Sequence, residues 1–214
     1  SRRQRQMCIR DRSPEELAEI RSRLKKLGYD IFIIGNIGSS YEKPDIAHFR
    51  KWLPALDMIY TFGLGEIDGT SMESKTPLYR RMADEAGKKL MMPVYPGYYG
   101  AWLNGRNDFY QVHDGLDNAH RTWLCAMEAR PQWLHYTTWN DHDETSLLPM
   151  IFTPGNVPVT RAYSDVFKGK SAVTGKPEAV FAYHREELPG TLLRFEAMTL
   201  PTLKPGSTVR LSGR

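Results

Sequence analysis

The sequence is poor in cysteine, has no long apolar run and carries no surplus of one charge over most of its length. Cys8 and Cys125 are the only cysteines among 214 residues, so a disulfide-rich scaffold is excluded. No apolar run approaches the roughly 20 residues that a membrane-spanning helix needs, so no membrane segment is expected. Aromatic residues make up 11% of the chain and charged residues 25%, a balance that excludes a disordered or low-complexity protein. The composition therefore predicts a folded globular domain.

The basic excess of the chain lies entirely in its N-terminal segment. Residues 1–12 hold five arginines and one acid, and the remainder holds 24 basic and 24 acidic residues. The folded part thus has no electrostatic reason to bind phosphate, and no nucleic-acid partner is expected. The segment resembles the translated read-through of a sequencing adapter at the end of a metagenomic reading frame, and it lacks the amphipathic, serine-rich character of a presequence. We expect residues 1–12 to be an artefactual or disordered tail on a piece of a longer protein.

From Ser13 onward, helical and strand patterns alternate. Ser13 and Glu16 form a capping box, which predicts a helix that begins at Pro14 and ends at Gly28. Further helices are expected at 44–56, 76–90, 114–129 and 159–168, and strands at 30–36, 58–63, 91–97 and 133–139. Because these strands are apolar on both faces and alternate with helices, they predict an α/β fold with a parallel sheet covered by helices.

The repeat of about 30 residues suits either an open doubly wound sheet or a (β/α)8 barrel. No glycine-rich phosphate loop follows any strand, and polar and aromatic residues gather just after the strand ends, where a barrel has its active site. We therefore expect the C-terminal half of a (β/α)8 TIM barrel at 13–172. From residue 173 to 214, short strands separated by proline and glycine predict the start of an all-β sandwich. Half a barrel would leave two sheet edges unpaired.

The most distinctive segment is the acidic loop Trp139-Asn140-Asp141-His142-Asp143-Glu144, at the end of the fourth predicted strand. Three carboxylates in four residues repel one another, and glycoside hydrolysis gives such crowding a use. One carboxyl group protonates the leaving oxygen while another activates water or attacks the anomeric carbon. Crowding raises one pKa, which keeps one acid protonated near neutral pH. The alternative is a solvated acidic loop that caps the following helix.

A second segment, the aromatic loop, places Tyr95, Tyr98, Tyr99 and Trp102 within eight residues, together with Gly97 and Gly100. Aromatic faces stack on the C–H faces of sugar rings, and the glycines allow the tight turns that would present them. Ordinary packing in the core or the loop is the alternative for each single residue.

The remaining reactive residues indicate no metal site and no cofactor. His113 and His120 lack the i, i+4 spacing of zinc-binding helices, so solvated positions on a helix face are expected for both. Cys125 stands beside Trp123, Leu124 and Met127 on a helix face that the pattern predicts to be buried, as a small core residue rather than a nucleophile.

Together these segments resemble glycoside hydrolase family 71, the α-1,3-glucanases. The family's Tyr-Met-Met-Pro-Val-Ser-Pro-Trp-Phe-Tyr is similar to the run from Leu90 to Tyr99, and its Trp-Asn-Asp-Tyr-Gly-Glu-Ser is similar to the run from Trp139 to Thr145. Trp123 corresponds to a family tryptophan, and the segment from Phe181 to Arg185 resembles the strand that opens the family's β domain. The similarity covers most of the chain between Met58 and Arg185.

This resemblance implies a (β/α)8 barrel with a C-terminal β-sandwich that cuts α-1,3-glucan in an endo fashion. The family's essential carboxylates carry over to Asp141, as base or nucleophile, and to Glu144, as general acid. The chain departs from the family where His142-Asp143 replaces Tyr-Gly and where Gly97 replaces an aromatic residue. Either change could mean a different glycan or linkage.

Three functions follow as alternatives. The first is an α-1,3-glucanase with Asp141 and Glu144 catalytic and with Tyr95, Tyr98, Tyr99, Trp102, Trp139, Asn140 and Asp143 binding the sugar. The second is a related barrel glycosidase on another α-glycan, such as an endo-α-mannosidase. The third is a barrel that binds carbohydrate without cutting it. A polysaccharide or oligosaccharide is the expected partner in each case, and secretion is expected of an enzyme that acts on a polymer.

Overall fold

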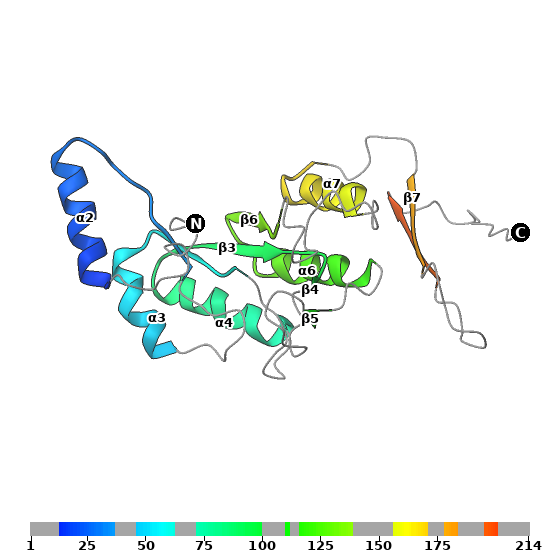
Figure 1. Ribbon diagram of the computed structural model, residues 1–214, viewed down its shortest axis with the longest axis horizontal. Helices are drawn as coiled ribbons and strands as arrows, with labels where there is room; N and C mark the ends of the chain where they lie inside the picture. The colour runs from blue at the N-terminus through cyan, green and yellow to red at the C-terminus, as the bar shows by residue number, and fades with distance from the viewer. Residues whose placement is uncertain are drawn as a thin grey trace, which may run out of the picture. The chain divides into compact units, whose positions relative to one another are not determined.

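The computed structural model describes residues 13–36, 46–62, 72–99, 110–111, 116–138, 156–170, 178–183 and 195–200 (Figure 1). The helices are α2 (Pro14–Lys26), α3 (Ile46–Trp52), the short 3-10 helix η1 (Leu53–Ala55), α4 (Met72–Glu85), α6 (Asp117–Glu128) and α7 (Asn156–Phe167). The strands are β1 (Ile34–Asn36), β2 (Met58–Tyr60), β3 (Lys89–Val94), β4 (Tyr98–Tyr99), β5 (Tyr110–Gln111), β6 (Trp133–Tyr136), β7 (Glu178–Tyr183) and β8 (Phe195–Leu200). Within these residues, no helix is long and apolar enough to cross a membrane.

The main sheet has the strand order β1-β2-β3-β6. β1 pairs with β2 in parallel, with Ile34 opposite Met58, and β2 pairs with β3 in parallel, with Met58 opposite Lys89. A helix follows each of β1, β2 and β3 along the chain before the next strand of this sheet. Parallel strands that are neighbours both in sequence and in space, joined by helices, form the wall of a (β/α)8 barrel. The predicted α/β class and the parallel sheet are therefore confirmed.

Helix α2 begins as its sequence predicts. The backbone N–H of Glu16 donates to the Ser13 hydroxyl at 3.1 Å, and the N–H of Ser13 donates to the Glu16 carboxylate at 2.7 Å. Gly28 follows the helix with φ of +87°, a conformation that a glycine adopts without strain. The apolar stripe of the helix is only partly covered, since Ile20 is 39% and Leu27 is 72% exposed.

The chain forms two compact units. The first comprises Ser1–Met92 with Ala129–Leu134, and the second comprises Pro93–Glu128 with His135–Arg214. The core of the first unit contains side chains that are fully or almost fully buried, among them Phe49, Leu56, Met58, Ile59, Tyr79 and Leu90. The rings of Phe49 and Tyr79 meet edge to face with centroids 5.5 Å apart, an arrangement that adds to the energy of burial.

β1 passes close to Leu56, and this leaves room only for a glycine at position 35. A Cβ atom placed on Gly35 would clash with the two methyl groups of the buried Leu56 side chain. The strand can therefore approach the start of the next βα unit more closely than a side chain would allow.

Charged side chains hold the N-terminal ends of β1 and β2. The Arg21 guanidinium of α2 donates to the Asp57 carboxylate in a part-buried ion pair. The same Asp57 oxygen accepts the backbone N–H of Ile33 at 2.8 Å, one residue before β1 begins. The hydrogen bond from Arg21 lowers the pKa of Asp57, with the N–H of Ile33 acting in the same direction against the cost of burial.

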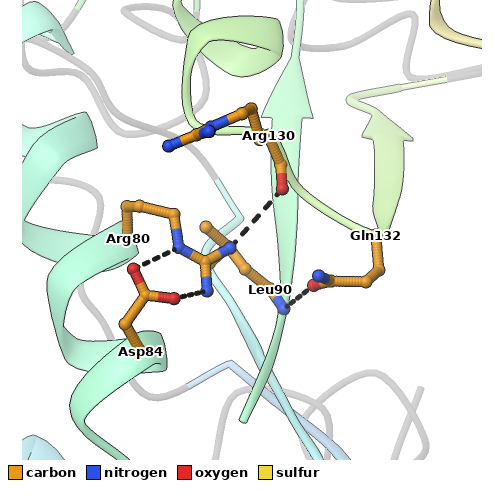
Figure 2. A network of polar contacts seen from close by, with 5 residues as sticks. All are labelled: Arg80, Asp84, Leu90, Arg130 and Gln132. Atoms are coloured by element: carbon orange, nitrogen blue, oxygen red, sulfur yellow. Dashed lines mark hydrogen bonds and ion pairs between the residues drawn. The ribbon is translucent and has the colours of Figure 1, made fainter. Parts of the chain in front are cut away.

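A second polar network lies at the N-terminal end of β3 (Figure 2). The Arg80 guanidinium of α4 pairs with Asp84 one turn later, and its third donor reaches the carbonyl oxygen of Arg130 at 3.5 Å. Gln132 accepts the Leu90 N–H through its side chain at 2.8 Å and donates its own N–H to the Leu90 carbonyl at 3.0 Å. The turn that leads into β6 is thereby held to both α4 and β3.

Three of the predicted elements need corrected boundaries. The helix predicted at 76–90 is α4, Met72–Glu85, because Gly87 takes φ of +61° and the Lys88 N–H folds back onto the Ala83 carbonyl. The released residues begin β3 at Lys89, two residues before the predicted strand, and β3 ends at Val94 rather than at 97. The helix predicted at 159–168 is α7, which begins three residues earlier, at Asn156, and ends at Phe167. The other helices and strands of the sheet keep their predicted places and are shorter at their ends than predicted.

Beyond the barrel-like part, β7 and β8 form an antiparallel pair over six residues each, from Glu178 opposite Leu200 to Tyr183 opposite Phe195. This pair agrees with the β texture predicted after residue 173. The third strand of that prediction, at 207–213, lies outside the described residues, and the division at 172 stays a prediction.

Candidate functional site

The first part of the aromatic loop leaves β3 directly and is packed against α6. Tyr95 is 5% exposed, so its side chain lies in the interior of the second unit. The Tyr95 N–H donates to the Thr122 hydroxyl at 3.3 Å, and that hydroxyl lies 3.0 Å from the Tyr95 carbonyl oxygen. Asn118, one helical turn earlier, donates from its side-chain amide to the Pro96 carbonyl at 2.7 Å. The start of the aromatic loop is therefore fixed to one face of α6.

After this contact the chain enters a small hairpin. β4 and β5 are antiparallel, with Tyr98 opposite Gln111 and Tyr99 opposite Tyr110. Tyr110 was not among the predicted sugar-binding residues, because it lies beyond the run that ends at Trp102 and only its pairing with β4 brings it to Tyr99. A second aromatic pair in the sequence, Phe109-Tyr110, was the signal that could have found it. Trp102 lies outside the described residues.

The end of β6 is hydrogen-bonded to the end of β3. The Thr137 N–H, just after β6, donates to the carbonyl of Val94, the last residue of β3, at 2.9 Å. The aromatic loop begins at the residue after Val94, and the acidic loop begins two residues after Thr137. The described residues that lead into the two segments are therefore neighbours. Trp139, Asn140, Asp141, Asp143 and Glu144 lie outside the described residues.

The last residues of β6 carry polar groups that no sequence motif singles out. His135 is half-buried, and its Nδ1 atom lies 2.9 Å from the Thr137 hydroxyl, two residues along the chain. Burial lowers the pKa of His135, which favours a neutral imidazole at physiological pH. Burial raises the pKa of Tyr136, so its phenol stays protonated. The signal in the sequence is position, since His135 precedes Trp139 by four residues within the strand predicted at 133–139.

His120 differs from its prediction as a solvated residue on a helix face. It is half-buried, and its Nδ1 atom is hydrogen-bonded to the Tyr163 hydroxyl of α7. Tyr163 in turn stacks on Trp123, with ring centroids 5.6 Å apart and planes 13° apart. The amphipathic faces of α6 and α7 meet through these rings, which accounts for the burial of His120.

The predicted buried face of α6 is confirmed in part. Trp123 is 4% and Cys125 is 5% exposed, so Cys125 is the small core residue that was predicted. Leu124 is 46% exposed, and its prediction as buried is wrong because successive helical residues are about 100° apart, so the buried neighbours Trp123 and Cys125 leave Leu124 on another part of the helix surface. No group of three or more histidine, cysteine, aspartate or glutamate side chains with the geometry of a metal site occurs in the described part of the chain.

Comparisons with known proteins place the fold. No protein-family model matches the sequence, and no curated protein matches it. Among solved structures, the GH99 endo-α-mannosidase from Bacteroides thetaiotaomicron in complex with bis-tris-propane superposes with a TM-score of 0.57 at 15% identity, over 73% of this chain and 54% of that one. A second structure of the GH99 endo-α-mannosidase from Bacteroides thetaiotaomicron gives a TM-score of 0.58 at 16% identity, over 73% of this chain and 52% of that one.

The chain thus spans about half the length of the solved structures it matches. Both are barrel enzymes, and the likeness supports the interpretation of the parallel sheet as part of a (β/α)8 barrel. At this level of identity the likeness concerns the fold.

Proposed function

We propose that the chain is part of a glycoside hydrolase that cuts within an α-linked glycan, with its active site where the acidic and aromatic loops leave the sheet. The observation that carries this proposal is the hydrogen bond from the Thr137 N–H to the Val94 carbonyl, because these two residues lead along the chain into the acidic and the aromatic loop. Active sites of parallel barrels lie at this end of the strands. The likeness of the fold to two endo-α-mannosidases supports a carbohydrate substrate.

In this proposal Asp141 and Glu144 are the catalytic pair. Glu144 acts as general acid on the leaving oxygen, and Asp141 acts as nucleophile or base. The separation of the two carboxyl groups sets the stereochemical outcome: about 5 Å gives retention and roughly 6.5 to 9.5 Å gives inversion. Tyr98, Tyr99 and Trp102 supply faces on which sugar rings stack. The remaining sugar-binding residues of the proposal are Trp139, Asn140 and Asp143, whereas Tyr95, which is 5% exposed, supports the loop from the interior.

Two glycans are the candidate substrates. The resemblance of the two loops to glycoside hydrolase family 71 favours α-1,3-glucan, and secretion belongs to that proposal because the glucan is a polymer. The endo-α-mannosidase fold of the solved structures favours an α-mannan. A barrel that binds one of these glycans without cutting it is the remaining alternative.

The decisive experiment assays the product of the whole gene that encodes this chain on α-1,3-glucan, α-mannan, α-1,4-glucan and β-glucan. Variants Asp141→Asn and Glu144→Gln test the pair, and Glu128→Gln is the matched control, since it makes the same chemical change at an exposed position of α6. We expect each catalytic variant to lose at least about a thousandfold in kcat while sugar binding is kept.

Each outcome identifies one alternative. Cleavage of α-1,3-glucan that both substitutions abolish supports the glucanase, and cleavage of α-mannan under the same control supports the mannosidase. Binding without cleavage would leave a carbohydrate-binding barrel and contradict the catalytic proposal. Activity that survives both substitutions would move catalysis to other residues.

A further inference from the structure

We infer that Asn118 and Thr122 of α6 are positioning residues that hold the start of the aromatic loop, and that this hold sets how tightly sugar binds. The two residues are called the α6 clamp below. The part of this inference that concerns sugar rests on the proposed function. The part that concerns the loop conformation rests on the described geometry alone.

The Thr122 hydroxyl contacts the backbone on both sides of Tyr95. Thr122 is fully buried, and its hydroxyl accepts the Tyr95 N–H at 3.3 Å. Its single proton faces the carbonyl oxygens of Tyr95 and Ala119, each at 3.0 Å. A hydroxyl can accept and donate at once, and neither a methyl group nor a charged group of this size can do both. The contact is therefore specific for threonine or serine.

Asn118 holds the next residue by a separate bond. Its side-chain amide donates to the Pro96 carbonyl at 2.7 Å, and Asn118 is 5% exposed. Because proline has no N–H, the carbonyl is the one backbone group through which residue 96 can be held. Two consecutive loop residues are thus fixed by two side chains one helical turn apart.

The prolines limit the sheet ladder at this place. Pro93 and Pro96 both lack the N–H that a sheet ladder needs, and β3 ends at Val94 between them. Beyond Val94, the α6 clamp supplies hydrogen bonds to the backbone of Tyr95 and Pro96.

The clamp acts on the hairpin through a very short connection. Tyr98 follows Pro96 by two residues, so the chain between them spans at most about 7 Å. Fixing the carbonyl of Pro96 therefore limits where β4 begins, and with it the two tyrosines that the proposed function uses. Loss of the clamp should weaken sugar binding without touching the carboxylates that do the chemistry.

The test compares Thr122→Val with Thr122→Ser and Thr76→Val in the product of the whole gene. Valine keeps the shape of threonine and removes the hydroxyl, and serine keeps the hydroxyl. Thr76→Val is the matched control, because Thr76 is a buried helical threonine whose hydroxyl has no hydrogen-bond partner. Hydrogen exchange is followed at the amides of residues 95, 98 and 99, and the dissociation constant of a glycan oligosaccharide is measured in the Glu144→Gln background.

We expect Thr122→Val to speed amide exchange at these positions about tenfold and to raise KM and the dissociation constant about tenfold, with kcat within about twofold of the parent. Thr122→Ser and Thr76→Val should leave the amide exchange rates, KM, kcat and the dissociation constant near their parent values. Unchanged exchange in Thr122→Val would overturn the clamp. Faster exchange with an unchanged dissociation constant would overturn its role in binding.

Failure of the clamp and failure of the proposed function give different results. If the parent protein neither cuts nor binds any glycan, the proposed function is wrong. The hydrogen-exchange experiment still decides whether the clamp holds the loop. If Thr122→Val does not fold, Asn118→Leu removes the Pro96 bond alone, and the same faster exchange at residue 98 is expected. Protection equal to the parent in that variant would contradict the clamp.

Discussion

The two ends of the parallel strands are held by different chemistry. At the N-terminal ends, charged and partly exposed side chains do the work, as in the pairs of Arg21 with Asp57 and of Arg80 with Asp84. At the C-terminal end of β3, the contacts come from the neutral side chains of Asn118 and Thr122, which are almost wholly buried. The first kind of contact tolerates movement and solvent, and the second demands matched partners.

The two kinds of contact fix the backbone with different precision at the two ends of the strands. An exposed ion pair adds little energy and survives small shifts of the backbone, so it suits an end that has only to be stable. A buried hydrogen bond adds little net energy as well, yet its loss leaves a polar group unpaired away from water. Such contacts therefore fix one conformation. The end that carries the candidate site has them.

The largest effect on stability is expected when a charge is placed in the α6 clamp. Asn118→Asp puts a carboxylate, which only accepts, against the Pro96 carbonyl, which also only accepts. We expect a loss of about 3 kcal/mol in the free energy of unfolding at pH 7.5. Urea unfolding measures it, with Asp117→Asn at the exposed neighbouring position as control.

The loss in Asn118→Asp should depend on pH in a defined direction. Burial raises the pKa of the new carboxyl group in the folded state above its unfolded value. The deficit therefore grows as pH rises from about 4 and shrinks as pH falls, because a protonated carboxyl can donate to Pro96. A deficit that is equal at pH 4.5 and pH 7.5 would show that residue 118 is not held away from water.

At the opposite end of β3, Gln132→Ala should have a smaller effect. The variant removes the acceptor of the Leu90 N–H and leaves the backbone pairing of the two residues in place. We expect a loss of about 1 kcal/mol in the free energy of unfolding and no change in KM for the glycan. A change in KM larger than twofold would mean that this end also shapes the site.

The ion pair of Arg21 and Asp57 should make the stability of the protein depend on pH. The hydrogen bond from Arg21 lowers the pKa of Asp57 in the folded state. Its stabilisation is present above the unfolded pKa near 4 and is lost as pH falls through the lower folded value. Asp57→Asn should thus cost roughly 0.5 to 1 kcal/mol at pH 7 and match the parent at the acid end. A cost that grows toward low pH would reverse this sign, and the same unfolding series detects it.

The smallest effect is expected for Arg80 and Asp84. A double-mutant cycle of Arg80→Gln and Asp84→Asn should give a coupling energy of about 0.3 to 0.5 kcal/mol, because Asp84 is 65% exposed and the pair lies one helical turn apart. The coupling should fall further in 1 M salt. A coupling above 1 kcal/mol that resists salt would place this pair with the buried contacts.

The local patterns of the sequence predicted the fold class well. Ser13 and Glu16 fix the start of α2 because a capping box is complete within four residues. The boundary between α4 and β3 was predicted less well, although Gly87 after α4 is the same kind of helix-ending glycine as Gly28 after α2. The register of β3 against β2 depends on tertiary packing, and residues 88–90 alone do not encode it.

The sequence predicts the loops of the candidate site but not the α6 residues that hold one of them. Tyr95 stood out because several aromatic residues share its loop. Thr122 did not stand out, because a threonine in a helix is common and its partner lies 27 residues earlier in the chain. Contacts of this kind depend on the packing of a helix against a strand end, and no spacing rule reveals them. The acidic pair Asp141 and Glu144 stays a prediction.

Each end of the strands has a tryptophan, and the surroundings of the two differ, so the fluorescence emission of the two should differ. Trp133 opens β6 and is 48% exposed, whereas Trp123 follows Thr122 in α6 and is 4% exposed, with an indole N–H that has no partner. An indole surrounded by apolar groups emits at shorter wavelength than one in water. A variant that keeps Trp123 as its single tryptophan should therefore follow the unfolding of the region around the α6 clamp, and one that keeps Trp133 alone should follow the opposite end. Coincident unfolding curves from the two variants would show that the two ends unfold together.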